Sequence, residues 1–154
     1  MRLPILVFCL FLTLTPAYAQ ERQWSLDASG SEAYLVFGVA DTDDVGLSFW
    51  CKIGSGTVSI FERFDRKVIV KDQPTKVKLK VDGEIFDIKM QASVSEGSNS
   101  GSLEGPVSVG GTVMKAVLHA SKFSLTAFGH TSSYPLADAD VAGLLQTCSR
   151  AVGN

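Results

Sequence analysis

The stretch TKVKLKVDGEIFDIKM, residues 75–90, decides the fold class because it predicts an antiparallel β-hairpin. Apolar and polar residues alternate on both sides of Asp82-Gly83, a dipeptide typical of two-residue type I′ turns. With this turn, the predicted cross-strand pairs are Val81–Glu84, Leu79–Phe86 and Val77–Ile88. One face of the hairpin should therefore lie in a core and the other in water.

The water-facing side of this hairpin carries three lysines spaced two residues apart. The lysines and their expected cross-strand neighbours are Lys76–Lys89, Lys78–Asp87 and Lys80–Ile85. We interpret them as a solvated strand face that also protects a sheet against edge-to-edge pairing. An anion-binding stripe is the alternative, although no aromatic residue is interleaved with the lysines as in a nucleic-acid site.

The residues before this hairpin predict further strands. Residues 20–32 form a polar lead-in or an edge strand, and the apolar segment 33–39 is typical of a strand buried on both faces. The segment VGLSFWCKI alternates, and its inner face comprises Leu47, Phe49, Cys51 and Ile53. Glycines at 54 and 56 then separate it from a second alternating segment, TVSIFERF, so the two predict another hairpin.

The second half of the chain predicts helices as well as strands. Residues 95–106 are rich in Ser and Gly and predict a loop, whereas Val113 and Val117 favour a helix over 111–121 with Thr112 near its start. Residues 123–129 alternate as a strand, and 130–135 predict a loop.

The end of the chain predicts an amphipathic helix capped by Asp138 or Asp140 and ended by Gly153. Its apolar stripe comprises Val141, Leu144, Leu145 and Cys148. The fold class expected is α+β: an antiparallel β-sheet meander packed by a short helix and a C-terminal helix, with one disulfide.

The N-terminal residues 1–19 predict a signal peptide. Arg2 precedes an apolar run at 5–14, and Ala17-Tyr18-Ala19 is a small-residue cleavage site. We expect residues 20–154 to form one α+β domain in the bacterial periplasm, with secretion into the medium as the alternative. Without Arg2, 13 basic side chains oppose 16 acidic ones, a net charge of about −3 that argues against a nucleic-acid partner.

Two cysteines remain after the predicted cleavage. Cys9 belongs to the signal segment, so Cys51 and Cys148 form an even pair, which predicts a disulfide in an oxidising compartment. Closing so long a loop stabilises a fold by up to about 4–5 kcal/mol in the chain-entropy model. Two lone cysteines are too few ligands for a zinc site.

Three aspartates, Asp41, Asp43 and Asp44, resemble the start of a calcium-binding EF-hand loop. Counted from Asp41, however, position 5 is Val45 and position 12 is Lys52, where a bidentate glutamate is needed. We therefore predict an Asp-rich turn, with a looser calcium site as the alternative. We expect no metal and no cofactor.

No catalytic motif is evident, and we predict that the protein is not an enzyme. His119 and His130 are isolated in the sequence. Gly54 and Gly56 flank Ser55, but this segment lacks the strand-to-helix context of a nucleophile elbow. We name no catalytic residue. Trp50 and Phe61 lie on strand faces opposite the predicted core and form a possible binding surface; the alternative is a sheet covered on both sides.

The chain resembles small secreted proteins of Gram-negative bacteria in its Trp24, its LVFG strand, its Asp-rich turn, its FWC segment and its C-terminal cysteine. Its tail, FSLTAFGHTSSYPLADADVAGLLQTC, is similar to the ends of invasion-associated locus B-type proteins. We expect an exported, non-catalytic binding or accessory protein whose partner is an unknown protein or small ligand of the cell envelope. The alternatives are an inhibitor or immunity-type protein that blocks an envelope enzyme and, third, a small envelope hydrolase.

Overall fold

The computed structural model describes residues 21–65, 71–95, 97 and 100–150, which form nine strands and two helices. The strands are β1 (Gln23–Ser29), β2 (Glu32–Gly38), β3 (Val45–Lys52), β4 (Thr57–Asp65), β5 (Gln73–Val81), β6 (Glu84–Val94), β7 (Ser100–Ser108), β8 (Lys122–Ala127) and β9 (His130–Pro135). The helices are α1 (Thr112–His119) and α2 (Val141–Ser149). The predicted signal peptide lies outside the described residues.

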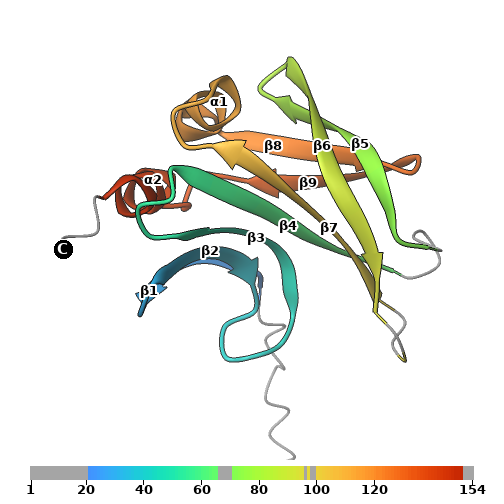
Figure 1. Cartoon of the computed structure of the whole chain (residues 1–154), viewed down its shortest axis with the longest axis horizontal. Coiled ribbons are helices and arrows are strands. Elements are labelled where there is room, and N and C mark those ends of the chain that lie inside the picture. Colours follow the sequence, from blue (N-terminus) through green and yellow to red (C-terminus); the bar gives the residue numbers. More distant parts are fainter. Residues whose placement is uncertain (1–20, 66–70, 96, 98–99, 151–154) are drawn as a thin grey trace, which may run out of the picture.

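All nine strands belong to one antiparallel sheet with the order β1-β2-β3-β4-β7-β6-β5-β8-β9 (Figure 1). The first four strands follow one another as a meander. β4 then pairs with β7, so the order of the next three strands is reversed before β8 and β9 complete the sheet. The predicted α+β class, with an antiparallel sheet, a short helix and a C-terminal helix, is confirmed.

The sheet curls so strongly that its first and last strands face each other across the core (Figure 1). Aromatic rings fill the space between them, and the ring centroids of Trp24–Phe49, Phe49–Phe123 and Phe123–Tyr134 are 5.9, 5.7 and 5.2 Å apart. In addition, the Trp24 Nε1–H donates to the Pro135 carbonyl oxygen at 2.6 Å. The edges are therefore held together by side chains.

The predicted register of the β5–β6 hairpin is confirmed. Val81 faces Glu84, Leu79 faces Phe86 and Val77 faces Ile88. Asp82 and Gly83 connect the strands with φ angles of 42° and 105°, which is the left-handed backbone that a type I′ turn requires. Local turn chemistry and alternation were sufficient to predict this unit.

The prediction of a loop over 95–106 is wrong, because most of this segment is β7. Its inward residues Gly101, Leu103, Gly105 and Val107 are buried. A Cβ at Gly105 would lie 2.6 Å from the Lys89 carbonyl oxygen, so glycine permits a close approach of two strands here. Glycine and serine mark a crowded sheet in this case, and not a turn.

The prediction of a loop over 130–135 is also wrong, because these residues form β9. A two-residue turn at Phe128-Gly129, with φ angles of 51° and 78°, joins β8 to β9. The only core side chain of β9 is Tyr134, which is 6% exposed. Because the other residues of β9 are mostly polar, its sequence shows no apolar alternation that would predict a strand.

The helices depart from their predicted limits. α1 begins at Thr112 and ends at His119, and its buried residues are Met114 and Val117. At the start of α2, the Asp140 carboxylate accepts a hydrogen bond from the Gly143 N–H at 2.8 Å, so Asp140, and not Asp138, is the cap. α2 ends at Ser149, before Gly153, which lies outside the described residues.

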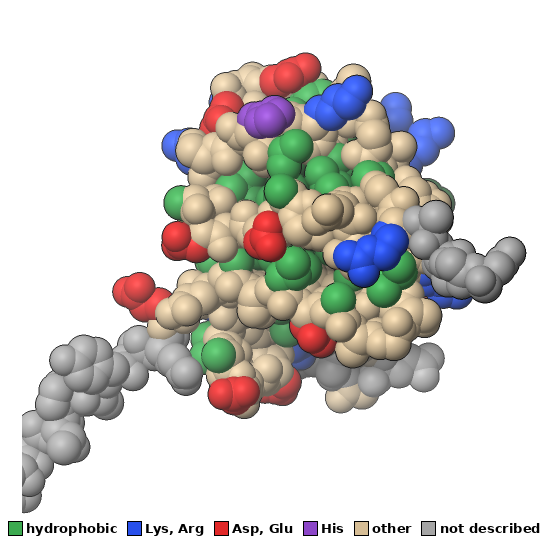
Figure 2. All heavy atoms as spheres, turned by 90° about the vertical axis from the view of Figure 1, so that its left-hand side faces the viewer, with side chains coloured by type: hydrophobic (Ala, Val, Ile, Leu, Met, Phe, Trp, Pro, Cys, Tyr) green, Lys and Arg blue, Asp and Glu red, His purple; other side chains and the backbone are tan. Residues whose placement is uncertain are grey.

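The predicted disulfide is present: Cys51 of β3 is bonded to Cys148 of α2 across 97 residues of sequence. Both cysteines are buried, and α2 packs against β1 and β2. The two helices lie at the same end of the curled sheet, which we call the closed end (Figure 1). Figure 2 looks onto this end and shows acidic and basic side chains spread over it, with hydrophobic side chains between them.

The opposite end of the sheet, where β1, β3 and β7 begin and β4 ends, is called the open end. The strand directions follow from the antiparallel order, so Arg22, Asp44 and Phe64 come together here although they are far apart in sequence. The fold thus places a helix-covered, cross-linked end opposite one formed by strand termini and turns.

Candidate functional site

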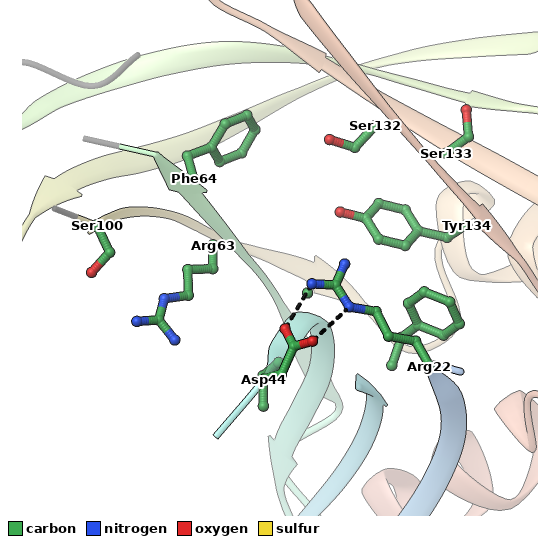
Figure 3. A pocket seen from close by; sticks show the side chains of 11 residues that line it. Arg22, Asp44, Arg63, Phe64, Ser100, Ser132, Ser133 and Tyr134 are labelled. Carbon is green, nitrogen blue, oxygen red and sulfur yellow. Dashed lines mark hydrogen bonds and ion pairs between the residues drawn. The ribbon is translucent and has the colours of Figure 1, made fainter. Parts of the chain in front are cut away.

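A pocket of about 610 Å³ lies at the open end, between the termini of β1, β3 and β4 and the strand β9 (Figure 3). Its lining combines charged, hydroxyl and aromatic side chains. The principal ones are Arg22, Asp44, Arg63, Phe64, Ser132 and Tyr134. Pockets that bind small ligands commonly combine an apolar wall with a few polar groups that fix orientation.

Arg22 and Asp44 form an ion pair on one wall of the pocket (Figure 3). The Arg22 Nη2 donates to Asp44 Oδ1 at 2.6 Å and its Nε donates to Oδ2 at 3.3 Å, a two-point contact. The hydrogen bonds from Arg22 lower the pKa of the Asp44 carboxyl. A Cβ at Gly46 would lie 3.1 Å from an Arg22 guanidinium nitrogen, so glycine leaves room for this pair.

The aspartate cluster forms a turn between β2 and β3. Asp41 has a φ of 59°, the Thr42 hydroxyl donates to the Val39 carbonyl at 2.8 Å, and the Asp44 N–H donates to the Thr42 hydroxyl at 3.1 Å. Val39 and Asp44 are also joined by a backbone hydrogen bond of 3.0 Å. Within the described ranges, no group of three or more His, Cys, Asp or Glu side chains is arranged to hold a metal ion.

Beside the pocket, Glu62 is completely buried in the core. It follows Ile60 and precedes Phe64 on the inward face of β4. The Tyr134 hydroxyl donates to Glu62 Oε1 at 2.6 Å, whereas Oε2 has no hydrogen-bond partner among the described residues. Burial raises the pKa of Glu62, against the opposing effect of the Tyr134 and Ser132 hydroxyls.

The Glu62–Tyr134 pair joins β4 to β9, two strands that are not neighbours in the sheet. Burial and the nearby Glu62 carboxyl also raise the pKa of the Tyr134 hydroxyl. A buried polar group with an unsatisfied atom costs stability, so this arrangement is unusual in an otherwise apolar core. It marks the open end as the polar part of the interior.

Trp50 and Phe61, the predicted binding surface, lie on the outer face of the sheet, and both are half-buried. The Trp50 ring stacks with that of Tyr34 at 6.2 Å, and its Nε1–H donates to Glu104 at 2.9 Å. Phe61 lies directly opposite Glu104 in the β4–β7 register. We call Tyr34, Trp50 and Phe61 the outer aromatic patch.

The two histidines are not brought together with any of these groups. His119 ends α1 and His130 begins β9, and both are exposed. Neither makes a hydrogen bond with a side chain of the pocket among the contacts of the described residues. The structure therefore combines Arg22, Asp44, Glu62 and Tyr134 at one site, and leaves the histidines outside it.

Glu62, Tyr134 and Arg22 were not identified as site residues from the sequence. One local signal was available for Glu62, because it occupies an inward position in the alternation of SIFERF. Tyr134 carried no such signal, since its segment predicted a loop. The pairing of the two spans 72 residues and depends on the curl of the sheet.

Comparison of the sequence with protein-family models, with curated proteins and with solved structures found no match. Among the described residues, the helices are all too short to cross a membrane. The disulfide is consistent with an oxidising compartment outside the cytoplasm.

Proposed function

We propose that this protein is an exported, non-catalytic binding protein of the bacterial periplasm that receives a small polar ligand in the pocket at the open end. The observation that carries the proposal is that Arg22, Arg63 and Ser132 line one hollow together with Phe37 and Phe64. Guanidinium and hydroxyl donors beside aromatic rings suit a ligand with both an anionic or carbonyl group and an apolar part.

The site is better suited to binding than to catalysis. Its groups with raised pKa values, Glu62 and Tyr134, are 0% and 6% exposed; Glu62 does not line the pocket, and Tyr134, which does, already donates its hydroxyl proton to Glu62. A general acid or base must come within hydrogen-bond reach of the group it serves. Two of the charged groups that a ligand can reach, Arg22 and Asp44, already pair with each other, which leaves Arg63 as a further cation of the pocket.

The periplasmic location in this proposal is supported by three observations. Residues 1–19 have the pattern of a signal peptide, Cys51 and Cys148 are oxidised, and residues 123–148 resemble the ends of invasion-associated locus B-type proteins. Fractionation of a bacterium expressing the full chain tests this part, since the mature protein should be released with the periplasmic fraction.

Native mass spectrometry of the protein purified from periplasm tests ligand binding. We expect a bound small molecule that is lost from Arg63→Glu, because this change reverses an exposed charge at the pocket rim. The matched control is Arg150→Glu, an exposed arginine just after α2 at the closed end. Equal retention by both variants would place the ligand elsewhere, and an unliganded wild-type protein would contradict the proposal.

An inhibitor that blocks an envelope enzyme is the second candidate, and the outer aromatic patch favours it. Partly exposed Trp and Tyr side chains are enriched at protein–protein contact centres. In that case Trp50→Ala should abolish both capture and inhibition of an envelope hydrolase, while Arg63→Glu should leave them intact. The binding-protein candidate thus predicts that Arg63→Glu impairs function, whereas the inhibitor candidate predicts that Trp50→Ala does.

A further inference from the structure

The lysines of β5 form a solvated strand face, as the sequence predicts, but the prediction that they also protect a sheet edge is wrong. β5 lies inside the sheet and pairs with β6 on one side and β8 on the other (Figure 1). Lys76, Lys78 and Lys80 are exposed on its outer face, opposite the buried Val77 and Leu79. A central strand needs no protection against edge-to-edge pairing, so this concentration of charge calls for another explanation.

Next to these lysines, the outer face contains a hollow of about 560 Å³. Lys80 faces Ser124 across β5 and β8, and Ser124 faces Ser133 across β8 and β9, so an ammonium and two hydroxyls lie in one row. Lys122 adds a second ammonium to the lining. Ammonium and hydroxyl groups can donate hydrogen bonds to the oxygens of a phosphate group.

The acidic side chain in the hollow's described lining, Asp82, is engaged elsewhere. Its two carboxylate oxygens accept hydrogen bonds from the N–H and the hydroxyl of Ser121, each at 3.2 Å. This contact ties the β5–β6 turn to the second residue after α1. The Asp82 carboxylate keeps its charge, so the two ammonium groups of Lys80 and Lys122 leave the lining with one net positive charge.

Positive charge continues beyond the hollow along β5 and β6. Lys76 lies directly opposite Lys89, and like charges at such a position repel each other. Lys78 is opposite Asp87, the one acidic residue of this outer row. Since alternate residues of a strand are about 7 Å apart, the lysines of β5 extend over roughly 14 Å. A single small anion would not cover that length.

Ile85 adds an apolar group to this charged face. It lies opposite Lys80 and is 59% exposed, the most exposed large hydrophobic residue among those described. An exposed aliphatic side chain beside lysines suits a surface that contacts an anionic bilayer, because the cations can meet phosphates while the apolar group enters the interface.

We propose that this outer face of β5, β6 and β8, which we call the lysine face, docks on an anionic membrane surface, with a lipid phosphate in the hollow between Lys80 and Lys122. The arrangement combines a two-lysine, two-serine cradle with a row of further lysines and an exposed isoleucine. Ser133 lines both this hollow and the open-end pocket, whereas Lys80 and Lys122 line the hollow and not the pocket, so variants of the two lysines test this surface by itself.

Vesicle flotation tests the proposal. The mature, oxidised protein should float with vesicles of phosphatidylcholine mixed with phosphatidylglycerol, should not float with phosphatidylcholine alone, and should be released by about 0.5 M NaCl, which screens charges beyond a few ångströms. Lys80→Glu/Lys122→Glu should reduce the bound fraction at least tenfold, and Ile85→Ser should reduce it less.

Lys52→Glu is the matched control, because Lys52 is an exposed strand lysine on β3, away from the lysine face. It should bind vesicles like the wild type, and circular dichroism should show that all variants fold. Equal binding to both kinds of vesicle, or wild-type binding by Lys80→Glu/Lys122→Glu, would overturn the proposal. Saturable binding of inorganic phosphate without vesicle binding would also overturn it and would indicate a small-anion site.

Discussion

The two ends of the curled sheet differ in how their side chains affect the stability of the fold. At the closed end, the bond between Cys51 and Cys148 fixes α2 onto the sheet, and the buried side chains around it are apolar. At the open end, the interior contains Glu62, whose Oε2 has no hydrogen-bond partner within the described part of the chain, and an exposed ion pair borders a pocket. The first arrangement stabilises the fold, while the second retains polar groups that cost stability.

This contrast indicates that a function is to be expected at the open end. A fold that depended only on packing would gain by replacing a buried carboxyl with an apolar residue of similar size. The chain instead keeps Glu62 and Tyr134 at the end where strand termini leave a hollow. The fold can tolerate that cost because the disulfide at the closed end stabilises it independently of the open end.

The largest effect should come from the disulfide at the closed end. Cys51→Ser/Cys148→Ser should lower the free energy of unfolding by about 2–5 kcal/mol, because the unfolded chain regains the freedom of a long loop. Urea denaturation of variant and wild type measures the loss. Dithiothreitol should weaken the wild type to a similar extent and leave the variant unchanged; two reactive thiols in the native wild type would rule out the cross-link.

The next effect should come from the β5–β6 turn, which contacts Ser121 beside α1. Gly83→Val forces a β-branched residue into a φ of 105° and should cost about 1–3 kcal/mol. Gly110→Val is the matched control, since both positions have open space for a Cβ but Gly110 has no left-handed φ. Equal melting temperatures for the two variants would contradict the assigned turn geometry.

A pH-dependent effect should appear at the open end. The folded protein raises the pKa of Glu62 above its ordinary value of 4.5, so it binds that proton more tightly than the unfolded chain does. The resulting stability is complete below about pH 4.5 and is lost as the pH rises through the folded-state pKa, by about 1.4 kcal/mol per unit of pKa difference.

Glu62→Gln should therefore become more stable relative to the wild type as the pH rises from about 4.5 to neutrality. Denaturation at several pH values measures this difference. Glu84→Gln at the exposed hairpin tip is the control for the loss of one carboxylate. A constant difference between Glu62→Gln and the wild type would show that Glu62 does not titrate differently on folding.

The smallest effect should come from the exposed ion pair at the pocket. Asp44→Asn should lower the melting temperature only slightly at low salt, since both side chains are about half exposed. About 0.5 M NaCl should remove the difference from the wild type. A large, salt-independent loss would mean that the Asp44 carboxylate contributes more to stability than an exposed ion pair with Arg22 does.

The features that could be predicted from sequence are those with local physical causes. Asp82-Gly83 and the alternation around it specify one hairpin completely, and the two cysteines outside the predicted signal segment leave one intramolecular pairing. The open end could not be predicted in this way. Its pair Glu62–Tyr134 depends on how far the sheet curls, which is set by many side chains at once.

The two strands that were mistaken for loops show the same limit. In β7, Gly105 is required by the proximity of Lys89 on a neighbouring strand, a fact that no local pattern contains. In β9, Thr131 and Ser133 face outward, and only Tyr134 contributes substantially to the core. Glycine, serine and threonine therefore do not by themselves predict a turn. They also occur in a strand that closely approaches its neighbour, such as β7, and in a strand with little buried surface, such as β9.

Hydrogen–deuterium exchange tests the central claim most directly: the closed end holds the fold and the open end binds the ligand. The oxidised protein would be measured alone and with the small-molecule fraction of a periplasmic extract. We expect slow exchange of the β3 and α2 amides in both samples, and new protection confined to residues 44–46, 62–64 and 131–134. Protection appearing instead around Cys51 and Cys148, or no change with the extract, would contradict this account.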